Sequence, residues 1–117
     1  MITAAIGLHG LWRARLKSAI NTSRSDFNVA VVRVDDECEF GEFLRTKIDA
    51  RVMASSDYQS CLKLHREFHA LTASVLELAL SGRKAEALRA LEIGSPFSRT
   101  SGSLTAAMLQ WRDNLSH

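Results

Sequence analysis

The sequence has 117 residues, of which 46% are hydrophobic, and its 15 basic and 13 acidic side chains give a net charge of +2. This length and apolar content predict one domain, residues 1–117, that buries its own core without disulfides. The basic residues are spread along the chain, which argues against nucleic acid as a partner, because phosphate binding relies on a clustered basic face.

No apolar run approaches the roughly 20 residues that a membrane-spanning helix needs. The amino terminus lacks the basic-then-apolar layout of a signal peptide. We therefore expect a cytoplasmic protein with no direct membrane insertion. In such a protein the two cysteines, Cys38 and Cys61, are expected to be buried, catalytic or metal-binding rather than paired in a disulfide.

The first quarter of the chain has apolar residues at helical spacing. Residues Thr3 to Ile20 predict one amphipathic helix, and the polar run Asn21 to Asp26 predicts a loop. The β-branched stretch Phe27 to Val34 would suit a short strand, but a lone strand without a pairing partner is not stable. We expect an extended or loosely helical connector that packs on the helices.

The next helix is predicted to begin at the acidic run Asp35 to Glu37, whose carboxylates suit the free amides of a first turn. Cys38 falls in that first turn, and the helix is expected to continue to Ile48. Gly41 in its interior costs about 1 kcal/mol relative to alanine. We expect a close approach of neighbouring backbone or of a ligand to offset this cost.

The second half of the chain predicts further helices. One long helix is expected from Asp57 to Ser81, with Gly82 as its left-handed stop. Another is expected from Arg83 to Ile93 and to break before Pro96, where Ser95 caps the final helix. The whole pattern predicts an all-α fold: an antiparallel four-helix bundle with an additional short or broken helix near the carboxyl terminus.

Four side chains of this pattern are candidate metal ligands. His65 and His69 are four residues apart, so both imidazoles project from one face of the long helix. His9 lies on the first helix, and Cys38 lies in a first turn whose dipole and free amides favour the thiolate. Thiolate and imidazole are ligands that zinc prefers, and four of them fill a tetrahedron. The alternative is that these are satisfied core histidines and a buried free cysteine.

Three short segments carry these residues: His9-Gly-Leu-Trp12, Cys38-Glu-Phe-Gly-Glu-Phe43-Leu and Leu-His65-Arg-Glu-Phe-His69. In order and in spacing they resemble the three motifs of the chemoreceptor zinc-binding (CZB) domain family, and the resemblance covers nearly the whole chain. It departs from the family at Phe43, where Trp is more frequent, so the packing beside the site is expected to differ. The resemblance implies that His9, Cys38, His65 and His69 bind one zinc ion.

The resemblance also implies a four-helix bundle that pairs into a homodimer. CZB domains are bacterial cytoplasmic sensors that are attached to chemoreceptor signalling domains or to diguanylate cyclases, and some stand alone. The family is associated with sensing zinc and with oxidation of the ligand cysteine by hypochlorous acid. These properties predict a role in chemotaxis or in cyclic-di-GMP signalling.

The chemistry of one thiolate and three imidazoles agrees with a sensor that is not an enzyme, because four protein ligands leave no open position for an activated water. Cys38 is the oxidisable ligand. A carboxylate of Asp36, Glu37 or Glu42 is expected as an outer-shell partner. Two alternatives stay open: a structural module in which zinc only staples the helices, and a metal-dependent enzyme in which water displaces one ligand.

Two neighbours of His65 bear on these alternatives. A metalloprotease motif needs Glu directly after the first His, whereas Arg66 follows His65 here and Glu67 comes one residue later. Cys61 lies one turn before His65 on the same face. It could be a spare ligand or a resolving thiol, but we expect it to fill the core.

Overall fold

The computed structural model describes residues 2–34, 38–46 and 48–115, and these residues are all-α, with no strand among them. The all-α class predicted from the sequence is confirmed. The helices are α1 (Ile2–Gly10), α2 (Trp12–Thr22), α3 (Val29–Arg33), α4 (Glu39–Thr46), α5 (Ala50–Met53), α6 (Ser56–Leu80), α7 (Lys84–Ala90) and α8 (Pro96–Leu115). None of the described helices is long and apolar enough to cross a membrane.

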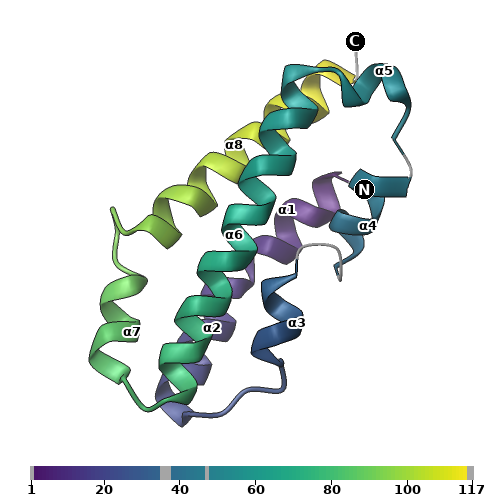
Figure 1. Cartoon of the computed structure of the whole chain (residues 1–117). Coiled ribbons are helices and arrows are strands. Elements are labelled where there is room, and N and C mark those ends of the chain that lie inside the picture. The colour runs from purple at the N-terminus through teal and green to yellow at the C-terminus, as the bar shows by residue number, and fades with distance from the viewer. Residues whose placement is uncertain (1, 35–37, 47, 116–117) are drawn as a thin grey trace.

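The 25-residue helix α6 is the centre of the fold, and α2, α3, α7 and α8 all pack against it (Figure 1). In Figure 1 the chain runs one way along α1 and α2, returns through α3, α4 and α5, runs back down α6 and returns again through α7 and α8. Each of these legs therefore lies antiparallel to the next. The third leg is the single helix α6, whereas the second is divided into three short helices, α3, α4 and α5.

The boundaries of α6 follow the prediction closely. The side chain of Ser55 caps the helix by accepting a hydrogen bond from the backbone N–H of Tyr58 at 3.2 Å. Gly82 follows its last turn with φ at +76°, the left-handed conformation that favours glycine. Its inner face is buried along its whole length: Tyr58, Cys61, His65, Phe68, His69, Thr72, Ala73, Val75, Leu76 and Ala79.

The predicted first helix is interrupted. α1 ends at Gly10 and α2 begins at Trp12, with Leu11 between them in a turn. The backbone N–H of Leu11 is shared between the carbonyl oxygens of Gly7 and Leu8, each at 3.3 Å. The prediction of a single helix from residue 3 to residue 20 was therefore wrong at Leu11, two residues after His9. α2 also extends two residues into the predicted loop, to Thr22.

The connector before Cys38 is helical rather than extended. Asn28 caps α3 with its side chain, which accepts hydrogen bonds from the N–H groups of Ala30 and Val31. Val32 is buried, and α3 packs against α6. The prediction for residues 27–34 was an extended or loosely helical connector, of which residues 29–33 are helical. The short-strand alternative is wrong.

The leg that follows differs most from the prediction. The expected helix start at residues 35–37 lies outside the described residues. α4 ends at Thr46 rather than continuing to Ile48. A further short helix, α5, follows and was not predicted, although Asp49 caps it through a hydrogen bond from the N–H of Arg51 at 2.7 Å.

The last leg contains the predicted break near Pro96. α7 ends at Ala90, three residues earlier than expected. Ser95 caps α8 by accepting a hydrogen bond from the N–H of Ser98 at 3.2 Å, as predicted. Arg13 on α2 holds this junction, because its guanidinium donates to the carbonyl oxygen of Leu91 and to the hydroxyl of Ser98.

Candidate metal centre

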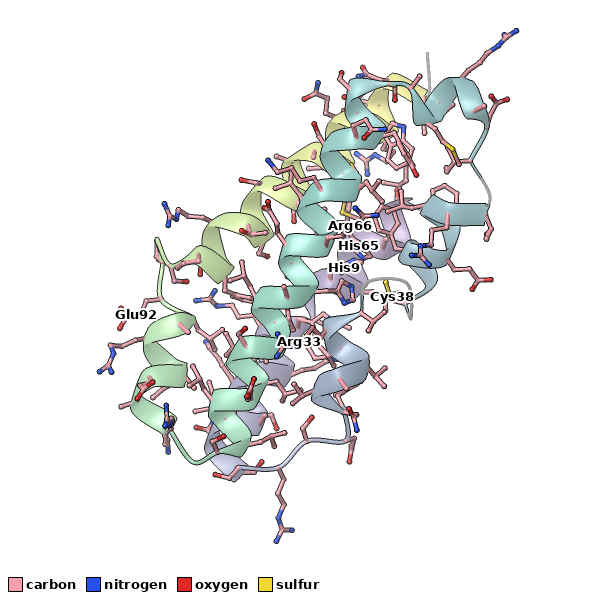
Figure 2. All side chains as sticks on the ribbon, in the orientation of Figure 1. His9, Arg33, Cys38, His65, Arg66 and Glu92 are labelled. Carbon is pink, nitrogen blue, oxygen red and sulfur yellow. The ribbon has the colours of Figure 1, made fainter. Side chains whose placement is uncertain are left out.

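The structure brings the four candidate ligands together from three separate parts of the chain. His9 comes from α1, Cys38 directly precedes α4, and His65 and His69 lie one turn apart on α6. One ligand atom from each lies within 4.8 Å of all the others. Figure 2 shows the side chains of His9, His65 and Cys38 directed towards one another beside α6.

The distances within this cluster fit a tetrahedral metal ion. Cys38 Sγ lies 3.3 Å from His65 Nε2 and 3.5 Å from His69 Nε2. His65 Nε2 lies 3.2 Å from His9 Nε2 and 3.0 Å from His69 Nε2. Zn–N and Zn–S bonds of ordinary length give tetrahedral edges of about 3.3 Å between two nitrogens and about 3.6 Å between nitrogen and sulfur. Four of the six edges agree with these values within a few tenths of an ångström, and the other two, from His9 to Cys38 and to His69, are at most 4.8 Å.

Backbone carbonyl groups fix two of the imidazoles. His9 Nδ1 donates to the carbonyl oxygen of Ala5 at 2.8 Å, and His69 Nδ1 donates to that of Val32 at the same distance. A carbonyl oxygen can only accept, so the proton of each neutral ring is on Nδ1. Both Nε2 lone pairs therefore point into the cluster, which is the tautomer that a metal requires.

Burial keeps His9 and His65 uncharged. The exposed fractions of His9, His65 and His69 are 9%, 0% and 5%. Desolvation lowers the pKa of His9 to about 4, against the smaller opposing effect of its hydrogen bond to Ala5. Desolvation, with a further contribution from the neighbouring His69 and His9, lowers the pKa of His65 to about 2. Neutral imidazoles are the form that binds zinc.

Cys38 occupies the N-cap position of α4 rather than its first turn. Its carbonyl oxygen accepts from the N–H of Glu42 at 3.0 Å, and the N–H of Gly41 donates to its Sγ at 3.4 Å. The sulfur therefore accepts a hydrogen bond from a free N–H at the start of the helix, and it also faces the histidines. This arrangement stabilises negative charge on the sulfur.

The predicted outer-shell carboxylates are not the groups that orient His9 and His69. Glu42 is exposed, and Asp36 and Glu37 lie outside the described residues. The orienting groups are the carbonyl oxygens of Ala5 and Val32. Sequence reasoning missed them because every residue has a carbonyl. In the sequence, the only indication of these two carbonyl groups is that Ala5 and Val32 are apolar residues suited to buried positions of α1 and α3.

Aromatic side chains surround the cluster and exclude water from part of it. The ring of Phe40 lies edge-on to His9 and His65, with centroids 5.8 and 5.1 Å apart. Phe68 lies 5.3 Å from His9. Phe43 stacks on Phe40 at 6.1 Å and also contacts Trp111 at 6.2 Å. Phe43 thus links the wall of the site to α8.

The remaining candidates lie apart from the cluster. Cys61 is fully buried in the core and is not a member of the ligand group, in agreement with the core-filling prediction. Desolvation, with a smaller contribution from Asp57, raises the pKa of its thiol to about 11. Arg66 and Glu67 are exposed on the other side of α6.

Comparison with known proteins identifies the family of this chain. No curated protein and no solved structure matches the chain significantly. A family model, described as the chemoreceptor zinc-binding domain, matches residues 9–76. The match covers more than half of the chain and includes all four residues of the His/Cys cluster. Zinc is accordingly the cofactor. The chain belongs to the chemoreceptor zinc-binding (CZB) domain family.

Proposed function

We propose that this chain is a zinc-binding sensory or regulatory domain in which His9, Cys38, His65 and His69 hold one zinc ion. The observation that carries the proposal is the convergence of three Nε2 atoms and one Sγ at tetrahedral spacing. Bound zinc would join α1, the start of α4 and α6, because its four ligands come from these three elements. The orienting bonds to Ala5 and Val32 prepare the site for it.

The donor set supports a sensor rather than an enzyme. Catalytic zinc sites keep one position for water or substrate, whereas four protein ligands occupy every position of a tetrahedron. No general base is needed at such a site, and Glu67, the nearest acidic residue along α6, is exposed. An exchangeable water or bound anion on the metal would instead favour the metal-dependent enzyme.

Cys38 is the proposed switch. Its side chain is partly exposed, whereas His65 is fully buried. With hypochlorous acid, the thiolate sulfur takes up the oxygen to give sulfenic acid, and chlorine leaves as chloride: RS⁻ + HOCl → RSOH + Cl⁻. The sulfur loses two electrons and chlorine gains them. The oxidised sulfur is a poor zinc ligand and a weaker acceptor for the N–H of Gly41, so both α4 and the cluster are released.

The proposed output is a change in a dimer of antiparallel four-helix bundles in the cytoplasm. The partner is a chemoreceptor signalling domain or a diguanylate cyclase domain, in the same chain or in another, and the pathway is chemotaxis or cyclic-di-GMP signalling. Family membership and the alternating directions of the four legs in Figure 1 support this proposal. Sedimentation of the zinc form at several concentrations measures whether the homodimer exists.

Metal analysis tests the ligand assignment. Protein purified without added zinc is expected to hold one zinc per chain, and Cys38→Ala is expected to lose most of it. Cys61→Ala is the matched control, because it removes the other thiol, which is not a member of the cluster, and should retain full zinc. Loss of zinc from both variants alike, or from neither, contradicts the assignment.

A structural module stapled by zinc is the second candidate, and oxidation separates the two. The zinc form is treated with a small molar excess of hypochlorous acid while released zinc and helix content are followed. A sensor releases zinc in proportion to Cys38 oxidation, changes its helical order and recovers both after reduction. A staple resists the same dose or unfolds irreversibly. The Cys61→Ala protein should respond as the native chain does.

A further inference from the structure

A groove with a volume of about 290 Å³ opens beside the metal cluster. Its apolar lining comes from Leu8 and Trp12 of the first leg and from Phe27, Val31 and Val34 in and beside α3. The rings of Trp12 and Phe27 are in contact, with centroids 4.9 Å apart. His9, Cys38 and His69 also line the groove. The groove is thus an apolar channel that begins at the surface and reaches three members of the cluster.

The walls of the groove expose unusual amounts of apolar surface. The exposed fractions of Leu8, Val31 and Val34 are 46%, 52% and 42%. Each Å² of apolar surface that an occupant removes from water contributes about 25 cal/mol. Apolar surface gathered around a hollow is typical of a ligand site.

One cation lies at this groove. The guanidinium carbon of Arg15 is 5.0 Å from the ring centroid of Trp12 and 5.0 Å from that of Phe27. No carboxylate among the described residues pairs with Arg15, and Arg15 is the only Lys, Arg, Asp or Glu among the described residues that line the groove. The described residues of the groove therefore present an apolar body and one positive charge.

We propose that this groove binds a small amphipathic carboxylate, with its anionic head at Arg15 and its apolar body between Trp12 and Val31. The volume limits the occupant to a small molecule, because it is close to the lower limit of ligand pockets. Charge complementarity to Arg15 selects an acid over a neutral or basic compound. The bound acid covers the side of the cluster on which Cys38 is partly exposed.

Titration calorimetry of the zinc-loaded protein tests this inference, with octanoate as the probe and 1-octanol as its neutral counterpart. Octanoate is expected to bind at one saturable site per chain and more tightly than 1-octanol. Arg15→Gln should weaken octanoate binding about tenfold, the effect of one lost contact to a charged group, and leave 1-octanol binding unchanged. Lys17→Gln is the matched control, since it removes the same charge from an exposed position of α2 and should change neither.

A second variant fills the groove without altering its charge. Val31→Trp places a large side chain in the wall and should abolish binding of both probes, and circular dichroism checks that the helices remain. The inference is overturned if octanoate does not saturate, or if Arg15→Gln and Lys17→Gln behave alike. It is equally overturned if sedimentation shows a dimer that Val31→Trp dissociates and octanoate does not.

Discussion

His69 donates its Nδ1 proton to the carbonyl oxygen of Val32 across 2.8 Å. This bond connects a member of the metal cluster to α3, a helix of only five residues. Helices of this length are not stable on their own, so the position of the Val32 carbonyl depends on the cap that Asn28 provides. The cap of a short helix is therefore part of the support of the metal site.

Asn28→Ala is expected to weaken zinc binding without touching a ligand. Loss of the cap costs about 1 kcal/mol of stability, and the freed α3 no longer fixes the tautomer of His69. Outer-shell changes of this kind lower metal affinity by about tenfold or more. Competition with a chelator measures the affinity, and urea unfolding measures the stability.

The matched control for this variant is Asp49→Ala. Asp49 caps α5 in the same way that Asn28 caps α3, but α5 contributes no residue to the cluster. We expect a comparable loss of stability with zinc affinity unchanged. Equal losses of affinity in the two variants would show that the caps act through global stability alone.

The two thiols are expected to differ in reactivity once zinc is removed. Cys61 is fully buried, and burial raises the pKa of its thiol to about 11, so it has almost no thiolate at pH 8. Alkylation of the folded, metal-free protein with iodoacetamide should label Cys38 alone, as read by peptide mass spectrometry. Denaturant should expose Cys61 to the same reagent. Labelling of Cys61 in the folded protein at a rate close to that of Cys38 would contradict its placement in the core.

The metal-free protein is expected to lose stability as the pH falls below about 6.5. Burial lowers the pKa of His9 to about 4 and that of His65 to about 2, both from an ordinary value of 6.5. Below pH 6.5 the unfolded chain therefore binds protons that the folded chain excludes, and the free energy of unfolding decreases. The decrease continues until the pH reaches the folded-state pKa of each group. Above pH 6.5 these two groups do not make the free energy of unfolding depend on pH.

Urea unfolding in the presence of a chelator at several pH values from 7.5 to 5 measures how the free energy of unfolding depends on pH. His9→Gln removes one of the two groups and should make the decrease in this free energy smaller. A stability that stays constant or rises over this range would show that both histidines are protonated in the folded protein.

Arg13→Gln is expected to destabilise the fold without releasing zinc. The guanidinium joins α2 to the carbonyl oxygen of Leu91 and to Ser98 at the junction of α7 and α8. Hydrogen bonds to a charged group contribute about 1.5 to 3 kcal/mol. Thermal unfolding should report a loss in this range while zinc content stays at one per chain. Arg89→Gln, at an exposed position of α7, is the control.

The parts of the structure that the sequence predicted best are those with a periodic apolar face. The buried side of α6, from Cys61 to Ala79, follows directly from helical spacing. The pairing of His65 with His69 follows from the same spacing. Because the three motifs also keep their order, all four members of the cluster could be chosen before the geometry was known.

The short elements were harder to predict, for physical reasons that differ between them. Asn28 is a good N-cap, but the valines after it favour strands, so the local preferences of residues 27–34 conflict. The turn at Leu11 has no Pro before or after it, and glycines at positions 7 and 10 are tolerated within helices. The groove at Arg15 depends on how α2 and α3 pack, which no local pattern encodes.

The four members of the metal cluster span residues 9 to 69 and come from three legs of the fold. No fragment that lacks one of these legs contains the full set, and no nascent chain contains it before His69 has been added. The proposed site can therefore hold zinc in full only after three of the four legs have been synthesised and brought together. Zinc content would then report the assembly of these three legs and not the docking of α7 and α8, which contribute no ligand.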